Sequence, residues 1–183
     1  MRYILFILQG FLVLCLALSC SSQQEEEQII DSSIVVPTMV THDVSMLISD
    51  SGVIKYRATT PTWISYDQGA DEPYQYFPDG IDFERIDSVF NATETIVADT
   101  AYNFEKKQLW HLIRNVEVTS VKGERFSTQE LFWDMKRHTV YSDSFIRIER
   151  NDNVIEGYGF TSTDDFSNYT IRQTNGVFRA KEQ

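Results

Sequence analysis

Apolar and polar residues alternate along this chain with a period of two, and the pattern dominates everything after residue 36. In residues 40–48 (VTHDVSMLI) the even positions are apolar except His42, while the odd positions are mostly polar. Such alternation predicts a strand with one buried side and one solvent-facing side. A sustained apolar stripe at helical spacing does not occur after residue 36. The pattern therefore predicts an all-β fold.

Short turn signals divide the alternating segments into about ten strand candidates. Asp50-Ser51-Gly52 and Pro78-Asp79-Gly80 have the composition of tight turns, and Lys122-Gly123 joins two long segments. Many strands joined by short turns are typical of a sandwich, a barrel or a jelly roll. The strand candidates cover residues 40–48, 53–58, 74–77, 81–84, 95–104, 109–121, 125–133, 139–148, 154–160 and 169–172.

The first nineteen residues have the layout of a secretory signal, because Arg2 precedes an apolar run over residues 3–18. Residues 16–20 (LALSC) resemble the lipobox of bacterial lipoproteins, in which a small residue precedes a cysteine that is acylated and becomes the new N-terminus. We predict a signal peptide over residues 1–19 and a lipid on Cys20. The alternative is an uncleaved N-terminal helix, although the run is marginal for a span of about 20 apolar residues.

A polar segment follows the cysteine. Residues 21–33 (SSQQEEEQIIDSS) are acidic and contain no aromatic residue, so they cannot bury enough apolar surface to fold. We predict a lipidated cysteine and flexible linker over residues 20–36, and one folded domain over residues 37–183. Sixteen linker residues at about 3.6 Å each allow a reach of roughly 60 Å.

The predicted domain lacks the usual motifs of catalysis. Cys15 and Cys20 both lie in the N-terminal segment, so the domain has no disulfide and no cysteine ligand. Nucleophile-elbow, H-E-x-x-H, Walker and dinucleotide motifs do not occur. His42, His111 and His138 lack metal-ligand spacing and are predicted to be structural. We therefore predict a protein that is not an enzyme and has no cofactor or metal.

Acidic residues are abundant enough to leave one enzyme class open. A glycosidase could be assembled from carboxylates that are distant in sequence, although none of the 27 is singled out. We interpret Asp164-Asp165 as a solvated turn. After loss of residues 1–19 the chain has 15 Lys and Arg against 27 Asp and Glu, a net charge of −12. That charge disfavours binding of nucleic acid or anionic lipid headgroups through long-range attraction.

Six segments share the order and spacing of a known family. Residues 47–57, 77–81, 98–102, 110–118, 123–134 and 154–160 each combine a turn with a strand. Together they resemble the LptC family of periplasmic lipopolysaccharide-export proteins, in the form found in Bacteroidetes-like bacteria. The resemblance covers about residues 40–175. Many members of that family keep an N-terminal transmembrane helix, whereas this chain carries a lipobox instead.

The resemblance implies a twisted antiparallel β-jelly roll, an open sandwich of two sheets with an apolar groove between them. It also implies that the protein receives lipopolysaccharide from an inner-membrane ABC transporter complex and passes it to a similar jelly-roll protein that bridges the periplasm. The implied location is the periplasmic side of the inner membrane, held there by the N-terminal lipid or by an uncleaved helix. The missing Walker motif agrees with a carrier whose energy comes from an ATPase partner.

Residues on the apolar phase of the strands are the groove candidates, although each could equally be an ordinary core residue. Edge strands, namely residues 40–48 and the strands near the C-terminus, are candidate docking sites for strand addition. Gly157 and Gly159 are predicted to mark a bend, with a structural bulge as the alternative to partner docking. A groove-free envelope lipoprotein that binds protein or glycan is the second functional hypothesis. The groove candidates are Val44, Met46, Ile48, Ile81, Phe83, Ile96, Trp110, Leu112, Val116, Leu131, Trp133, Ile146 and Ile148.

Overall fold

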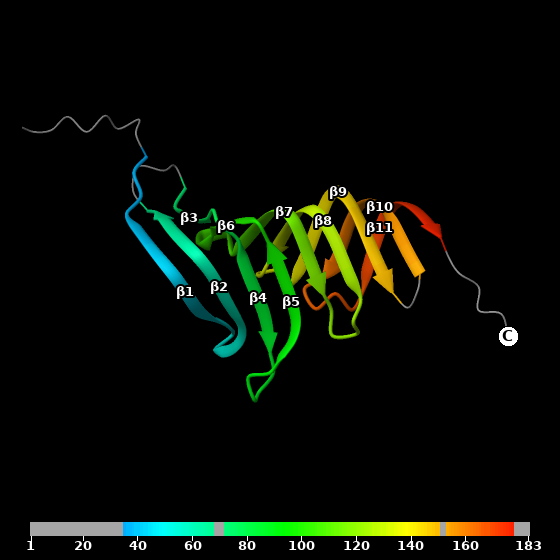
Figure 1. Ribbon diagram of the computed structural model, residues 1–183, viewed down its shortest axis with the longest axis horizontal. Coiled ribbons are helices and arrows are strands. Elements are labelled where there is room, and N and C mark those ends of the chain that lie inside the picture. Colours follow the sequence, from blue (N-terminus) through cyan, green and yellow to red (C-terminus); the bar gives the residue numbers. More distant parts are fainter. Residues whose placement is uncertain (1–34, 68–71, 151–152, 178–183) are drawn as a thin grey trace, which may run out of the picture. The chain divides into compact units, whose positions relative to one another are not determined.

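The computed structural model describes residues 35–67, 72–150 and 153–177, which form eleven antiparallel strands and one short 3-10 helix (Figure 1). The all-β prediction is confirmed. The predictions for Cys20, the signal peptide and most of the linker fall outside the described residues. The elements are β1 (Met39–Asp50), β2 (Val53–Tyr66), β3 (Tyr74–Phe77), β4 (Ile81–Ile86), β5 (Ala92–Ala98), β6 (Thr100–Phe104), η1 (Glu105–Lys107), β7 (Leu109–Thr119), β8 (Arg125–Asp134), β9 (Thr139–Arg150), β10 (Asn153–Thr163) and β11 (Tyr169–Val177).

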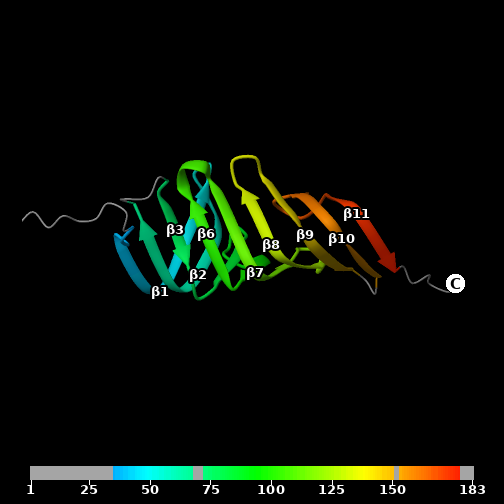
Figure 2. The ribbon, with the colours of Figure 1, turned by 90° about the horizontal axis from the view of Figure 1, so that it is seen from above.

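Six of the strands close into a ring of hydrogen-bonded neighbours. β2 pairs with β4 through its first part and with β3 through its last part. β7 pairs with β6 through its first part and with β5 through its last part. The β4–β5 and β3–β6 pairings complete the ring, and Figure 2 shows β3 and β6 beside β2 and β7. β1 is added at β2, while β8, β9, β10 and β11 follow β7 in order.

A line of pairing irregularities, which we call the crease, runs across the strands. In β1, Asp43 has φ 53° and is skipped in the register opposite Pro61 of β2. Arg114 and Asn115 have φ 63° and 45° where β7 changes partner from β6 to β5. The β8–β9 register shifts between Thr128 and Phe132, and the β9–β10 register shifts at Gly159. Strands that bend at bulges in this way pass from one sheet layer to another.

Two threonine hydroxyl groups and one backbone N–H donate hydrogen bonds to backbone carbonyls beside the crease. Thr60 Oγ1 donates to the Gly80 carbonyl at 2.7 Å, and Thr128 Oγ1 donates to the Phe145 carbonyl at 2.8 Å. The Asp99 N–H donates to the Arg114 carbonyl at 3.1 Å. Unpaired backbone groups are costly when buried, so short polar side chains at these positions stabilise the bend.

The crease divides the sheet into two layers with the core between them. The first layer contains β4, β5, the beginning of β2 and the end of β7. The second contains β3, β6, the end of β2 and the beginning of β7. On the side of the core opposite the crease, the β8–β9 turn and the β10–β11 loop extend the second layer. They approach the β1–β2 hairpin, the last residues of β4 and the first residues of β5, which lie on the side of the first layer. We call that meeting line the mouth.

Two strand predictions were wrong in detail, and the crease explains both. The predicted strand over residues 95–104 is broken at Asp99, where the chain leaves β5 and starts β6. The alternation in β1 is interrupted at Asp43, so Val40 is exposed although it shares the even phase of Val44. The register with β2 is the same on both sides of Asp43, so the left-handed backbone conformation at Asp43, not a register slip, changes which side chains face inward.

Candidate functional site

The interior between the two layers brings most of the groove candidates together. Ten of the thirteen belong to one core cluster, and none of the ten is more than 4% exposed. They pack on each other and on neighbours such as Tyr56, Phe77, Phe126 and Phe160, which the sequence analysis did not single out. The ten are Ile81, Phe83, Ile96, Trp110, Leu112, Val116, Leu131, Trp133, Ile146 and Ile148.

The remaining three candidates lie on β1 and are half-buried. Met46 and Ile48 pack against the edge of the core. Val44 instead lines a surface hollow of about 850 Å³ along the crease, together with Asp43, Asp99 and Arg114. Among the candidates, those of β1 are therefore the least enclosed.

Aromatic rings join the two layers in the half of the core nearer β1. Trp133 of β8 meets Tyr56 of β2 edge-on, with ring centroids 4.8 Å apart, and meets Phe83 of β4 edge-on at 5.6 Å. Phe83 in turn contacts Trp110 of β7 at 4.8 Å. The indole nitrogen of Trp133 has no hydrogen-bond partner among the described residues, so its N–H faces apolar surroundings. Edge-on aromatic pairs of this kind add to the stability gained from burial.

The other half of the core is filled by phenylalanines. Phe126 of β8 lies 5.8 Å from Phe160 of β10 and 5.1 Å from Phe166, measured between ring centroids. Phe166 belongs to the β10–β11 loop and is 1% exposed. The apolar interior therefore continues from β2 to the loop that precedes β11.

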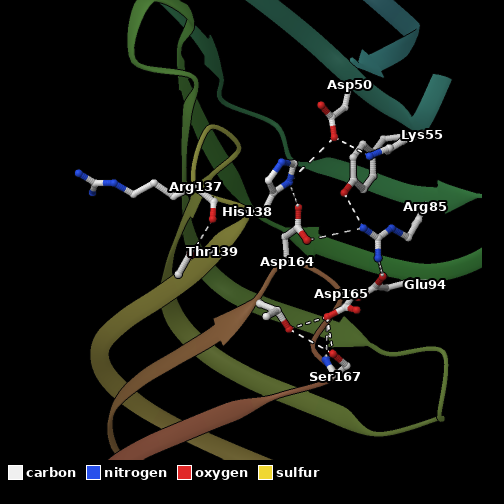
Figure 3. A network of polar contacts seen from close by, with 12 residues as sticks. Asp50, Lys55, Arg85, Glu94, Arg137, His138, Thr139, Asp164, Asp165 and Ser167 are labelled. Carbon is white, nitrogen blue, oxygen red and sulfur yellow. Dashed lines mark hydrogen bonds and ion pairs between the residues drawn. The ribbon is translucent and has the colours of Figure 1, made fainter. Parts of the chain in front are cut away.

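A cluster of polar and charged side chains lies across the mouth (Figure 3). In the first layer, Arg85 Nη2 donates to Tyr56 Oη at 3.0 Å, and Arg85 Nη1 donates to Glu94 Oε2 at 3.3 Å. In the second layer, His138 Nδ1 donates to Asp164 Oδ2 at 3.0 Å. Arg85 also pairs with Asp164 across the mouth, at 3.7 Å.

Glu94 is the most deeply buried carboxylate of this cluster, with 3% of its surface exposed. Its Oε1 has no hydrogen-bond partner among the described residues. The pKa of Glu94 is raised to about 7, mainly by burial, with Arg85 opposing the rise and Asp165 and Asp164 adding to it. In the same loop, hydrogen bonds from Thr163 and Ser167 lower the pKa of Asp165 to about 2.

None of the site residues predicted from the sequence belongs to this cluster, although one signal for it was present. Glu94 shares the inward phase of Ile96 and Ala98 on β5, and a charged residue on an apolar phase predicts a buried polar contact. Asp164 was interpreted as part of a solvated turn. In the structure, Asp164 and Asp165 do form a turn, but the Asp164 side chain is 14% exposed and joins the cluster, so the prediction that it is solvated was wrong.

The three histidines contact different partners, and His138 is the one that belongs to the charged cluster. His42 is within 3.3 Å of Thr62, measured from Nδ1 to Oγ1. His111 Nε2 donates to Glu130 at 2.8 Å, and its ring stacks on Phe132 at 4.2 Å. Within the described part of the chain, acidic, histidine and cysteine side chains form no group of three that could hold a metal.

The two glycines of β10 mark a bend and a close approach. Gly159 has φ 75° at the register shift between Tyr158 and Phe160, which is a β-bulge. A Cβ on Gly157 would lie 2.6 Å from Ile171 Cγ2 and closer still to the Gln173 carbonyl oxygen. β11 therefore covers Gly157, and a larger residue there would disturb the β10–β11 pairing.

The two strands at the ends of the sheet keep one edge open. β1 pairs with β2 and β11 pairs with β10, and each has its other edge without a strand partner in the described residues. These are the edges that the sequence analysis predicted as docking sites.

Comparison with known proteins assigns the chain to a family. The search of curated proteins gave no match. Within residues 35–67, 72–150 and 153–177, no helix is long and apolar enough to cross a membrane. The family described as "Lipopolysaccharide-assembly, LptC-related" matches residues 3–174, and its role is in lipopolysaccharide transport. That match agrees with the order of the turn-and-strand segments and with the jelly-roll architecture. The chain is thus a member of the LptC-related family of lipopolysaccharide-assembly proteins.

Proposed function

We propose that this protein receives lipopolysaccharide from an inner-membrane ABC transporter, holds the acyl chains between its two layers, and passes the lipid to a similar jelly-roll protein. The observation that carries the proposal is the continuous apolar interior from Tyr56 to Phe166. Membership of the LptC-related family supports the same cargo. The periplasmic side of the inner membrane, with Cys20 lipidated, is the proposed location.

The energetics favour a shielded path for such a lipid. An acyl chain of about 13 methylenes costs on the order of 10 kcal/mol to expose to water, at about 0.8 kcal/mol per methylene. Transfer from one apolar interior to another is nearly neutral in free energy. Such a carrier needs no nucleotide site of its own, and an ATPase partner would supply direction.

The packing of the interior also bears on the second hypothesis. Ten groove candidates pack against protein side chains, so lipid can enter only if the layers separate. A β-sandwich lipoprotein that binds protein or glycan without a groove would have the same closed core. The two functions differ in whether lipid ever reaches Phe83 or Trp133.

The open edges of β1 and β11 supply the proposed contacts with the transporter and with the bridge protein. An exposed edge offers unpaired backbone donors and acceptors, and a partner strand can extend the sheet there. Gly157 and Gly159 shape β10 behind the β11 edge, so their proposed role in docking is indirect.

A photo-crosslinking residue at Phe83 tests the interior directly. We expect lipopolysaccharide adducts at Phe83 in cells, because Phe83 is 1% exposed and faces the core. Asp82 is the matched control, since it is the preceding residue of β4 and is exposed on the outer face. Adducts at Asp82 but not at Phe83 would place the lipid outside the jelly roll.

Depletion separates the two functions in the cell. If the protein carries lipopolysaccharide, its loss should leave newly made lipopolysaccharide in the inner membrane. Normal delivery to the outer membrane after depletion would rule out the transport role and favour the groove-free lipoprotein.

A further inference from the structure

The β10–β11 loop, residues 164–168, covers the mouth of the jelly roll. Its Asp164 reaches the charged cluster of the first layer, and its Phe166 reaches into the core beside Phe126. Asp165 holds the loop in shape by accepting hydrogen bonds from Thr163 Oγ1 at 2.5 Å and from the Ser167 N–H at 3.0 Å. The loop is therefore a compact unit that presents one charge and one aromatic ring to the mouth. We call it the lid loop.

The lid loop is bound firmly to its own layer. His138 in the β8–β9 turn donates to the Asp164 carboxylate at 3.0 Å, and the Asp164 N–H donates to the His138 carbonyl at 3.1 Å. On the opposite side, Lys55 and Asp50 pair at 2.6 Å within the β1–β2 hairpin. Each side of the mouth is thus held together by short hydrogen bonds.

The contacts that cross the mouth are longer. Among the described residues, the side chains that face each other across it are Arg85 and Asp164, an ion pair at 3.7 Å, and the His138 ring and Asp50, at 3.9 Å (Figure 3). Both distances exceed those of ordinary hydrogen bonds, so the two sides of the mouth attract each other through charge without being fixed to each other by hydrogen bonds. The mouth can therefore separate between these groups while each side keeps its own bonds.

The backbone conformation of Phe166 also indicates that the lid loop can move away from the mouth. Its φ is 52°, a left-handed value that bulky residues rarely adopt because it costs conformational energy. In the closed loop, burial of the Phe166 ring against Phe126 and Phe160 offsets that strain. An acyl chain that entered the mouth would replace these apolar contacts with apolar contacts of its own.

We propose that the lid loop is the gate of the interior, and that the pairing of Asp164 with Arg85 and the insertion of Phe166 hold it closed until acyl chains enter. The inference rests on the proposed lipid-carrying function and adds the place and the residues of admission. The lipid would pass beneath the lid loop, opposite the crease, and the crease would act as the hinge between the layers.

A reversible lock tests the gate in the full chain. Arg85→Cys with Asp164→Cys can be bridged by a reducible bis-maleimide, and added lipopolysaccharide is then captured by a photo-crosslinker at Phe83. We expect at least tenfold less adduct in the bridged protein and recovery on reduction. The matched control bridges Asp50→Cys to Lys55→Cys, which lie within one hairpin. Single-cysteine variants control for reaction at Cys15 and Cys20.

Asp164→Asn tests whether the gate opens more readily when the pairing with Arg85 is lost. It removes the charge that pairs with Arg85, so we expect adducts to form several times faster and acrylamide to quench tryptophan fluorescence more strongly. Asp143→Asn is the control, because Asp143 pairs with Arg172 at an exposed position on the crease.

Equal capture by the bridged and unbridged proteins would overturn the gate. Absence of capture by the unmodified protein would overturn the lipid role, whereas unchanged quenching in Asp164→Asn would overturn the lid alone.

Discussion

Glu94 shows how one side chain can set the pH dependence of stability. Its pKa is raised from 4.5 to about 7 by burial, so the folded protein holds the proton more tightly than the unfolded chain does. The stability contributed by this proton is fully present below pH 4.5 and is lost as the pH rises to 7. At about 1.4 kcal/mol for each pKa unit, the loss amounts to about 3 kcal/mol.

Glu94→Gln should therefore stabilise the protein at pH 8, by up to about 3 kcal/mol, and change little at pH 4.5. Urea unfolding measured across that range gives both values. Glu84→Gln is the matched control, since Glu84 pairs with Arg57 on the partly exposed neighbouring strand. If the free energy of unfolding of both variants depends on pH as it does in the unmodified protein, ionisation of Glu94 does not destabilise the fold.

β10 and β11 depend on a glycine for their close approach. In Gly157→Ala the new methyl group would meet Ile171 and the Gln173 carbonyl at distances shorter than van der Waals contact. Overpacking of this kind costs about 1–3 kcal/mol, and here the strain falls on the pairing of an edge strand. We expect lower stability and faster hydrogen exchange at β11 amides.

Thr161→Ala on the same strand is the control for that change, because Thr161 is exposed and should cost less than about 1 kcal/mol. Slow exchange at β11 in Gly157→Ala would contradict the packing argument. The result also decides how docking can be studied, since a glycine variant that loosens β11 cannot separate folding from partner binding.

The jelly roll as a whole is held together by contacts between its two layers, and Trp133 is central among them. Its ring contacts Tyr56 and Phe83 of the first layer from its position on β8. Trp133→Ala should lower the free energy of unfolding by about 3–5 kcal/mol, because it leaves a cavity between the layers. Chemical denaturation measures the loss.

Val97→Ala provides the comparison, since Val97 is 42% exposed and its truncation should change stability by about 0.5 kcal/mol or less. A similarly small effect for Trp133→Ala would mean that the layers are held together elsewhere, for example by Phe126, Phe160 and Phe166. It would also weaken the case for a hinge at the crease.

The alternation in the sequence was sufficient for the all-β class and for the inward phase of most core residues. Ile81, Phe83, Trp110 and Leu112 were identified correctly as inward-facing, because side-chain direction along a strand follows from local geometry alone. The order of turns and strands was also sufficient for the family. Whether any of these residues line a lipid groove stays a prediction.

The crease, the closed interior and the charged mouth were decided by the tertiary structure. Asp43 and Arg114 look like ordinary strand residues in the sequence, and the left-handed conformations that they adopt depend on which strands lie opposite. Arg85 and Asp164 belong to segments far apart in the chain, and they meet because the sheet folds over at the crease. Alternation reports which face of a strand a residue occupies, but contact between two layers depends on how the whole sheet bends.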